Sequence, residues 1–95
     1  MEHGPLTVSV LTRLGMLAEA VERGQVIAWM TEGGTVHYGV ARAFTRDGGG
    51  LLLGEDVRDG FVWISGGDGL MERWLPVADL VAGLAEGRVA LDYTP

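Results

Sequence analysis

Clusters of glycine divide the middle of the chain into short segments and limit its fold more than any other feature. The clusters are Glu32-Gly33-Gly34, Asp47-Gly48-Gly49-Gly50 and Gly66-Gly67-Asp68-Gly69. Because only glycine enters positive φ without steric cost, such clusters are typical of tight turns between antiparallel strands. Between them, apolar and polar residues alternate as in half-buried strands. The pattern predicts five strands: Gln25–Thr31, Thr35–Phe44, Leu51–Leu53, Phe61–Ser65 and Leu70–Leu75.

Helical spacing replaces this alternation on both sides of the glycine-rich region. Over residues 8–23, apolar side chains recur every three or four positions: Val10, Leu11, Leu14, Leu17, Ala18 and Val21. Over residues 76–86 the same spacing begins at Pro76 and ends at Gly87: Val77, Leu80, Val81 and Leu84. Gly15, inside the first helix, indicates either a close approach of another backbone or a tolerated glycine.

These elements predict a mainly β, α+β fold in one domain spanning residues 1–95. Residues 1–6 form a flexible leader and residues 8–23 the N-terminal helix. A five-stranded antiparallel small barrel occupies 25–75. A short C-terminal helix over 76–86 and an edge strand over 88–93 complete the domain.

The region from Gly24 to Phe44 resembles the first motif of the Sm-like family of small barrels. SH3-like barrels share the same order of strand, double glycine, strand and glycine. Gly33-Gly34, then Gly39 five residues later and Phe44 five further on, are placed as in that motif. Residues 62–68, Val-Trp-Ile-Ser-Gly-Gly-Asp, look like the second motif. The resemblance implies an N-terminal helix followed by five strongly bent antiparallel strands.

The departures from the Sm-like pattern bear on function. The family contacts RNA bases through an asparagine, whereas this chain contains none and has glycines near Asp47–Gly50 instead. Ser65 replaces the arginine or lysine of the second motif. The resemblance therefore implies the fold without implying RNA binding.

Composition excludes several classes of function. With no cysteine, the chain has no disulfides, thiolate metal sites or cysteine nucleophile. Seven arginines, no lysine and thirteen carboxylates give a formal net charge of −6, which disfavours phosphate backbones because the arginines are spread along the chain. No signal peptide precedes the first helix, and no apolar run approaches the roughly 20 residues of a membrane span. We expect a cytoplasmic protein.

No catalytic constellation is apparent, and we expect neither an enzyme nor a bound cofactor or metal. The only histidines are His3, in the predicted leader, and His37, in a predicted strand. Glu55, Asp56 and Asp59 do not follow the spacing of a calcium loop. The run Gly48–Gly50 precedes a strand rather than a helix, so it is a turn and not a phosphate-binding loop.

Aromatic residues are the best candidates for function. Alternation makes both faces of the strand Phe61–Ser65 apolar, yet a small barrel has one interior. Either the two helices cover the second face, or a partner does. We favour a homo-oligomer, in which the last two barrel strands pair edge to edge or the tryptophan face packs across a two-fold axis. The predicted interface residues are Trp29, Tyr38, Trp63, Trp74, Arg42 and Arg73.

The first functional hypothesis is a non-enzymatic binding or regulatory module that self-associates and presents a protein-interaction surface. The second is an Sm-like ring that binds single-stranded RNA through aromatic stacking and contacts from Arg42, Arg46 or Arg58. The third is a metal- or small-ligand-binding domain that uses the carboxylates of Glu55, Asp56 and Asp59.

Overall fold

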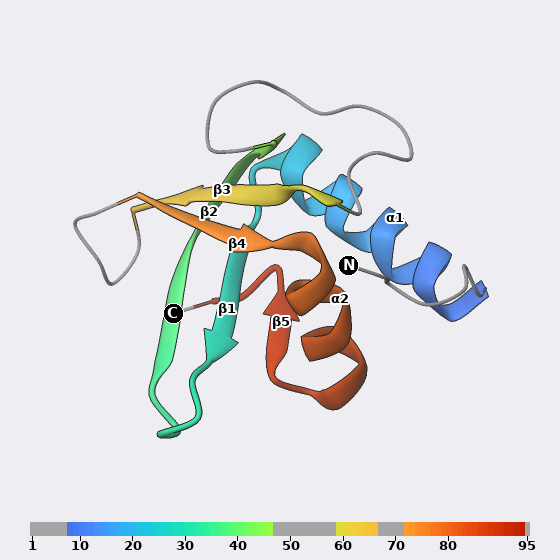
Figure 1. The fold of residues 1–95 in the computed structure, drawn as a ribbon. Coiled ribbons are helices and arrows are strands. Elements are labelled where there is room, and N and C mark those ends of the chain that lie inside the picture. The colour runs from blue at the N-terminus through green and yellow to red at the C-terminus, as the bar shows by residue number, and fades with distance from the viewer. Residues whose placement is uncertain (1–7, 47–58, 67–71, 95) are drawn as a thin grey trace.

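The computed structural model describes residues 8–46, 59–66 and 72–94, which form two helices and five strands (Figure 1). In chain order the elements are α1 (Val8–Arg23), β1 (Val26–Met30), β2 (Val36–Thr45), β3 (Phe61–Ser65), β4 (Arg73–Pro76), α2 (Val77–Glu86) and β5 (Val89–Leu91). The strands form one sheet in the order β4-β3-β2-β1-β5, and every neighbouring pair is antiparallel. The predicted α+β class, with one antiparallel sheet and two helices, is confirmed.

The sheet is not closed into the barrel that the sequence predicted. β4 and β5 stand at opposite ends of the strand order. Figure 1 shows α2 following the end of β4 and lying beside β5, and this helix contacts both edge strands. The ten residues of α2 thus fill the space in which the two edges would have to meet.

The fifth strand of the sheet comes from a different place than expected. The predicted strand Leu51–Leu53 lies outside the described residues. The predicted edge strand over 88–93 supplies β5, which pairs with β1 through Ile27↔Leu91, Ala28↔Ala90 and Trp29↔Val89. A sheet that returns its last strand to its first needs a long connection, and α2 provides most of it.

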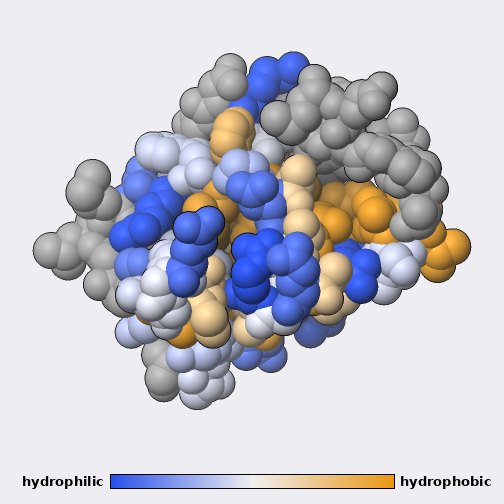
Figure 2. Space-filling model, turned by 60° about the horizontal axis from the view of Figure 1, so that its bottom comes forward, coloured by the Kyte–Doolittle hydropathy of each residue, from blue (hydrophilic) through white to orange (hydrophobic). Residues whose placement is uncertain are grey.

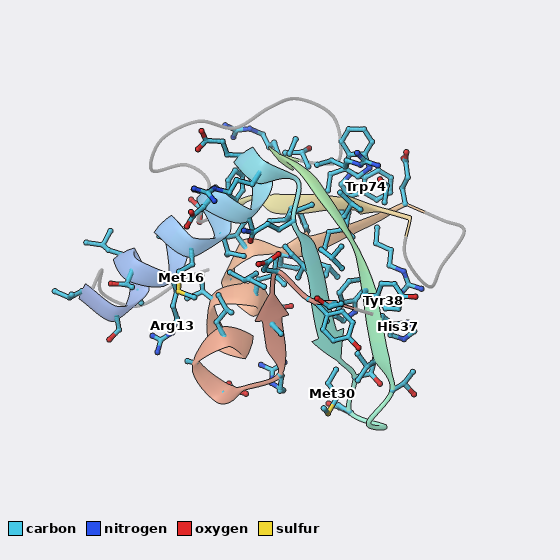
Figure 3. All side chains as sticks on the ribbon, turned by 180° about the vertical axis from the view of Figure 1, so that it is seen from behind. Arg13, Met16, Met30, His37, Tyr38 and Trp74 are labelled. Atoms are coloured by element: carbon cyan, nitrogen blue, oxygen red, sulfur yellow. The ribbon has the colours of Figure 1, made fainter. Side chains whose placement is uncertain are left out.

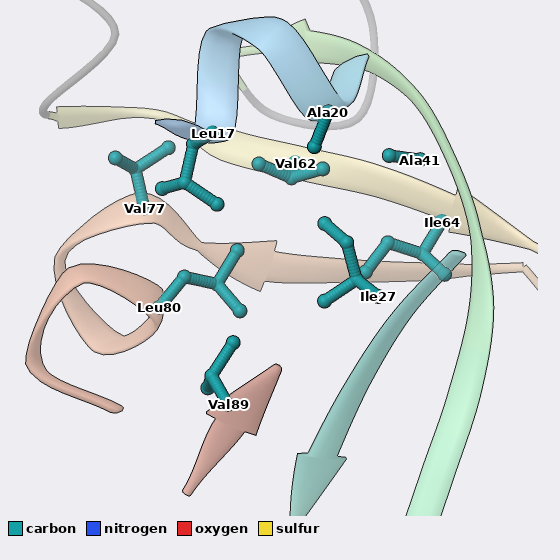
Figure 4. Packing of buried hydrophobic residues seen from close by; sticks show 9 residues of the cluster. All are labelled: Leu17, Ala20, Ile27, Ala41, Val62, Ile64, Val77, Leu80 and Val89. Atoms are coloured by element: carbon teal, nitrogen blue, oxygen red, sulfur yellow. The ribbon is translucent and has the colours of Figure 1, made fainter. Parts of the chain in front are cut away.

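One side of the sheet, which we call the inner face, packs against both helices. Leu17 and Ala20 of α1 and Val77 and Leu80 of α2 are buried there. Figure 4 shows them against the sheet side chains of the same cluster: Ile27, Ala41, Val62, Ile64 and Val89. Burial of these aliphatic groups is the main driving force for the fold.

The sheet curves toward its inner face. The guanidinium carbon of Arg73 on β4 lies 5.8 Å from the ring centre of Trp29 on β1, although two strands separate them in the sheet order. Gly39 permits the bend, because a Cβ at this position would lie 2.4 Å from Cγ2 of Ile64. A bulge between Ala41 and Ala43 increases the local twist of β2.

The first helix is less completely buried than its sequence pattern predicted. Leu17 is buried as expected, but Leu11 is 54% exposed and Ala18 is also exposed. A Cβ at Gly15 would meet no atom within 4 Å, so no close backbone approach from the described residues explains this glycine. Neither helix of the described residues is long and apolar enough to cross a membrane.

A tight contact joins α2 to β5 and provides a test of the packing. A Cβ at Gly83 would lie 2.3 Å from Cγ2 of Val89, so Gly83→Ala forces the strand and the helix apart. Overpacking of this kind costs about 1–3 kcal/mol, more than the gain in helix propensity of about 1 kcal/mol. We expect Gly83→Ala to lower the free energy of unfolding measured by denaturant titration.

The matched control is Gly15→Ala, because the added methyl enters open space. This substitution should raise the free energy of unfolding by up to about 1 kcal/mol through helix propensity alone. A Gly83→Ala protein as stable as the Gly15→Ala protein would show that the contact with Val89 is not tight.

Candidate functional site

The side of the sheet opposite the helices, which we call the outer face, is apolar over most of its area. Strand alternation fixes which side chains it presents, because their neighbours in sequence point into the core. From β1 and β2 it receives Val26, Ala28, Met30, Val36, Tyr38 and Val40, and from β3 and β4 it receives Phe61, Trp63, Ser65, Trp74 and Pro76. No helix of the described residues contributes to this side of the sheet.

Three large apolar side chains on the outer face remain substantially exposed. Trp74 and Met30 each keep 43% of their surface accessible, and Val36 keeps 42%. Figure 3 shows Trp74, Tyr38 and Met30 along the sheet, at the opposite end of the molecule from Arg13 and Met16 of α1. Large exposed apolar side chains gathered on one face are typical of an interaction surface.

The two tryptophans of β3 and β4 form a cross-strand pair. Trp63 lies directly opposite Trp74. The amide of Val77 donates to the carbonyl of Gly60 over 3.0 Å, so these two residues form a hydrogen-bonded pair. Hydrogen-bonded and non-hydrogen-bonded pairs alternate along an antiparallel ladder, which makes Trp63 and Trp74 a non-hydrogen-bonded pair. Side chains lie close together in such pairs. The Trp63 indole N–H is buried and meets no acceptor within the structure described, whereas Trp74 faces solvent. Trp74 is therefore the accessible member of the pair.

A small hollow lies on the outer face between β1 and β5. Its volume is about 140 Å³. Two alanines that pair across the strands, Ala28 and Ala90, give it a shallow floor, because neither side chain extends beyond Cβ. Its other lining residues include Met30, Val36, Arg88 and Tyr93. The Tyr93 ring, which lines the hollow, lies 5.7 Å from the ring of Tyr38.

Arg42 lies on the same side of the sheet as the tryptophan pair. It occupies the bulge of β2, and its Nε donates a 2.6 Å hydrogen bond to the Ser65 hydroxyl. Ser65 follows Trp63 by two positions on β3, so both belong to the outer face. Arg42 thus orients a charge beside the aromatic surface.

Two of the six predicted interface residues, Trp29 and Arg73, do not lie on the outer face. Trp29 lies on the inner face, where its ring stacks on His37 with centroids 5.9 Å apart and Arg73 lies over it. The contacts among Arg73, Trp29 and His37 connect β4 to β1 and β2 across the concave side of the sheet. Trp63, Trp74, Tyr38 and Arg42 remain as members of one face.

Four residues of the outer face and its hollow were not among those predicted from the sequence: Met30, Val36, Ala90 and Tyr93. Val36 could have been placed on the outer face from the sequence, because it lies two positions before Tyr38 on the same strand. Met30 then follows, because the register of the β1–β2 hairpin pairs it with Val36. Ala90 and Tyr93 gave no such signal, because their place on the face depends on the pairing of β5 with β1.

A second exposed apolar surface lies on the first half of α1. Val8 is 81% exposed and Met16 is 42% exposed. Together with Leu84 of α2 they line a groove of about 370 Å³. Figure 2 shows hydrophobic colour at the right-hand end of the molecule, where α1 begins.

The residues considered for metal and RNA binding lie only partly within the part of the chain that the structure describes. They contain no group of three or more His, Asp or Glu side chains placed to hold a metal ion. Of the carboxylates considered from the sequence, Glu55 and Asp56 lie outside the described residues, as does Arg58 of the RNA hypothesis. Arg42 and Arg46 lie on or just after β2, where Arg42 is engaged with Ser65.

Comparison with known proteins gives no family. The chain matches no protein-family model, no curated protein and no solved structure. Function therefore has to be argued from the residues of the two faces.

The turn beside the hollow contains the one ionisable pair with shifted pKa values among the described residues. Arg88 donates from Nε to Oε1 of Glu86 over 2.7 Å. This hydrogen bond and the charge of Arg88 lower the pKa of Glu86, and the same contact raises the pKa of Arg88. The contribution of Glu86 to stability is therefore present above its unfolded pKa and is lost as pH falls through the lowered folded pKa.

Arg88→Ala should raise the pKa of Glu86 toward its ordinary value, because the hydrogen bond and the charge that lower it both come from Arg88. Carboxyl carbon chemical shifts followed through a pH titration measure this directly. Arg23→Ala is the control, since Arg23 pairs with Glu19 instead. A Glu86 pKa that does not move in Arg88→Ala would contradict the hydrogen bond.

Proposed function

We propose that this chain is a non-enzymatic binding or regulatory module of the small Sm-like or SH3-type β fold. It self-associates and presents a protein-interaction surface. The element order supports the fold assignment, because an N-terminal helix precedes a strongly bent antiparallel sheet. The close packing of Gly39 against Ile64 also supports it, since Gly39 belongs to the resembling motif.

The observation that supports self-association most is the exposure of Trp74, Met30 and Val36 on an outer face that no helix of the described residues covers. Both helices bury their apolar side chains on the inner face, so the indole, phenol and thioether groups of the outer face have no helix to cover them. Such groups bind by removing apolar area from water, which is how aromatic and methionine side chains dominate protein interfaces. A second copy of the chain offers a matching apolar face.

The edge of the open sheet at β4 supports the same proposal. Along β4, the backbone N–H and C=O groups of successive residues point alternately toward β3 and away from it. The hydrogen bond from Val77 to Gly60 shows that Val77 points toward β3, so the backbone groups of Trp74 point away from it. The Met30 amide donates to the Arg88 carbonyl over 2.9 Å, and alternation then directs the backbone groups of Val89 and Leu91 away from β1. The edge of β4 thus carries donors and acceptors at Trp74 that can extend the sheet into another copy, whereas α2 packs against β5 at Val89.

Sedimentation velocity across a wide range of protein concentration tests the proposal. We expect the wild type to associate, and Val36→Glu to associate at least about tenfold more weakly, because it buries a charge in the interface. Leu11→Glu is the matched control. It places the same charge on an exposed apolar residue of α1, away from the outer face.

A wild-type protein that stays monomeric at every concentration would overturn the proposal. If Leu11→Glu dissociates the assembly and Val36→Glu does not, the association uses α1 and not the outer face.

A further inference from the structure

The hollow on the outer face has the size and chemistry of a site for an aromatic ring. Its volume is about 140 Å³ and it is open to solvent, so it can receive part of an aromatic ring laid against the sheet. Its floor is Ala28 and Ala90, and Met30, Val36 and Tyr93 also line it. An aromatic side chain that enters it contacts apolar groups at the floor and on more than one side.

The same face carries an aromatic side chain that needs such a site. Trp74 is 43% exposed, while its neighbour Trp63 is partly buried beside it. Trp74 lies on β4 and the hollow lies between β1 and β5, so the two are toward opposite ends of the strand order. Because the sheet curves toward the inner face, the bend moves them apart on the outer side, and Trp74 cannot fill the hollow of its own chain.

The charges beside the ring and beside the hollow are complementary. Glu72 precedes Trp74 by two positions and is exposed. Arg88 lines the hollow and is also exposed. Arg88 uses Nε for Glu86, and its remaining guanidinium N–H groups can bind a second carboxylate.

We propose that the Trp74 side chain of one copy occupies the Ala28–Ala90 hollow of a second copy, with Glu72 pairing with Arg88 of that copy. This inference rests on the proposed self-association and names the residues that meet in it. The site is complete only when another copy supplies the ring, because the ring and the hollow belong to different parts of the surface.

Two variants, each missing one half of the contact, test this proposal. Trp74→Ala removes the ring and keeps the hollow, whereas Ala90→Phe fills the hollow and keeps the ring. Each alone should associate at least about tenfold more weakly than wild type in sedimentation velocity, as expected for a central aromatic anchor. An equimolar mixture should form a heterodimer, because one variant still has the ring and the other still has the hollow.

Each outcome separates this inference from the proposed function. A monomeric wild type overturns both. If the wild type associates and either variant associates equally well, only the contact between Trp74 and the hollow is overturned. If both variants are monomeric and their mixture stays monomeric, the two residues do not meet, and the inference is again overturned.

Folding and charge are controlled separately. Circular dichroism and thermal unfolding confirm that each variant is folded, and Trp74→Thr replaces Trp74→Ala if the alanine variant unfolds, because threonine favours strands. Glu72→Arg tests the charge pair without altering the ring or the hollow. It should weaken association several-fold at low salt and less at high salt. Unchanged association of Glu72→Arg at low salt removes Glu72 from the contact.

Discussion

Both helices pack against the same face of the sheet, and the remaining features of the molecule depend on this arrangement. Leu17, Ala20, Val77 and Leu80 form one apolar cluster with the inward side chains of the strands. The inner face therefore holds the core. The outward side chains of the same strands are also apolar, and they have no second layer within the described residues. The helices and the sheet already form two layers, and a second molecule on the outer face would add a third layer.

The same packing explains why the sheet stays open. Closure into a barrel would bring β4 against β5, but α2 connects these strands and fits its Gly83 tightly against Val89. The Trp29–Arg73 contact spans the concave side of the curved sheet. The open edge of β4 and the absence of a helix on the outer face, within the part of the chain that the structure describes, thus have one origin.

Much of this fold follows from local sequence. Turn glycines and alternation predicted β1, β2 and β3 closely, and helical spacing predicted α1 and α2, because these signals depend only on nearby residues. Local sequence did not reveal which face of β1 points inward, so Trp29 was grouped with Trp74 although Ile27 places it on the inner side. It also did not reveal the hollow, since Ala28 and Ala90 meet only through the long-range pairing of β5. The exposure of Leu11 was missed because the apolar stripe of α1 is wider than the surface available to cover it.

Methionine oxidation by peroxide, measured by mass spectrometry as a function of protein concentration, tests directly whether a second copy covers the outer face. Met30 on the outer face and Met16 on α1 are exposed to nearly the same extent, 43% and 42%, so each serves as the reference for the other. If the account is correct, both react at similar rates in dilute protein, and only Met30 becomes protected as concentration rises. Equal rates at all concentrations, or protection confined to Met16, would contradict it.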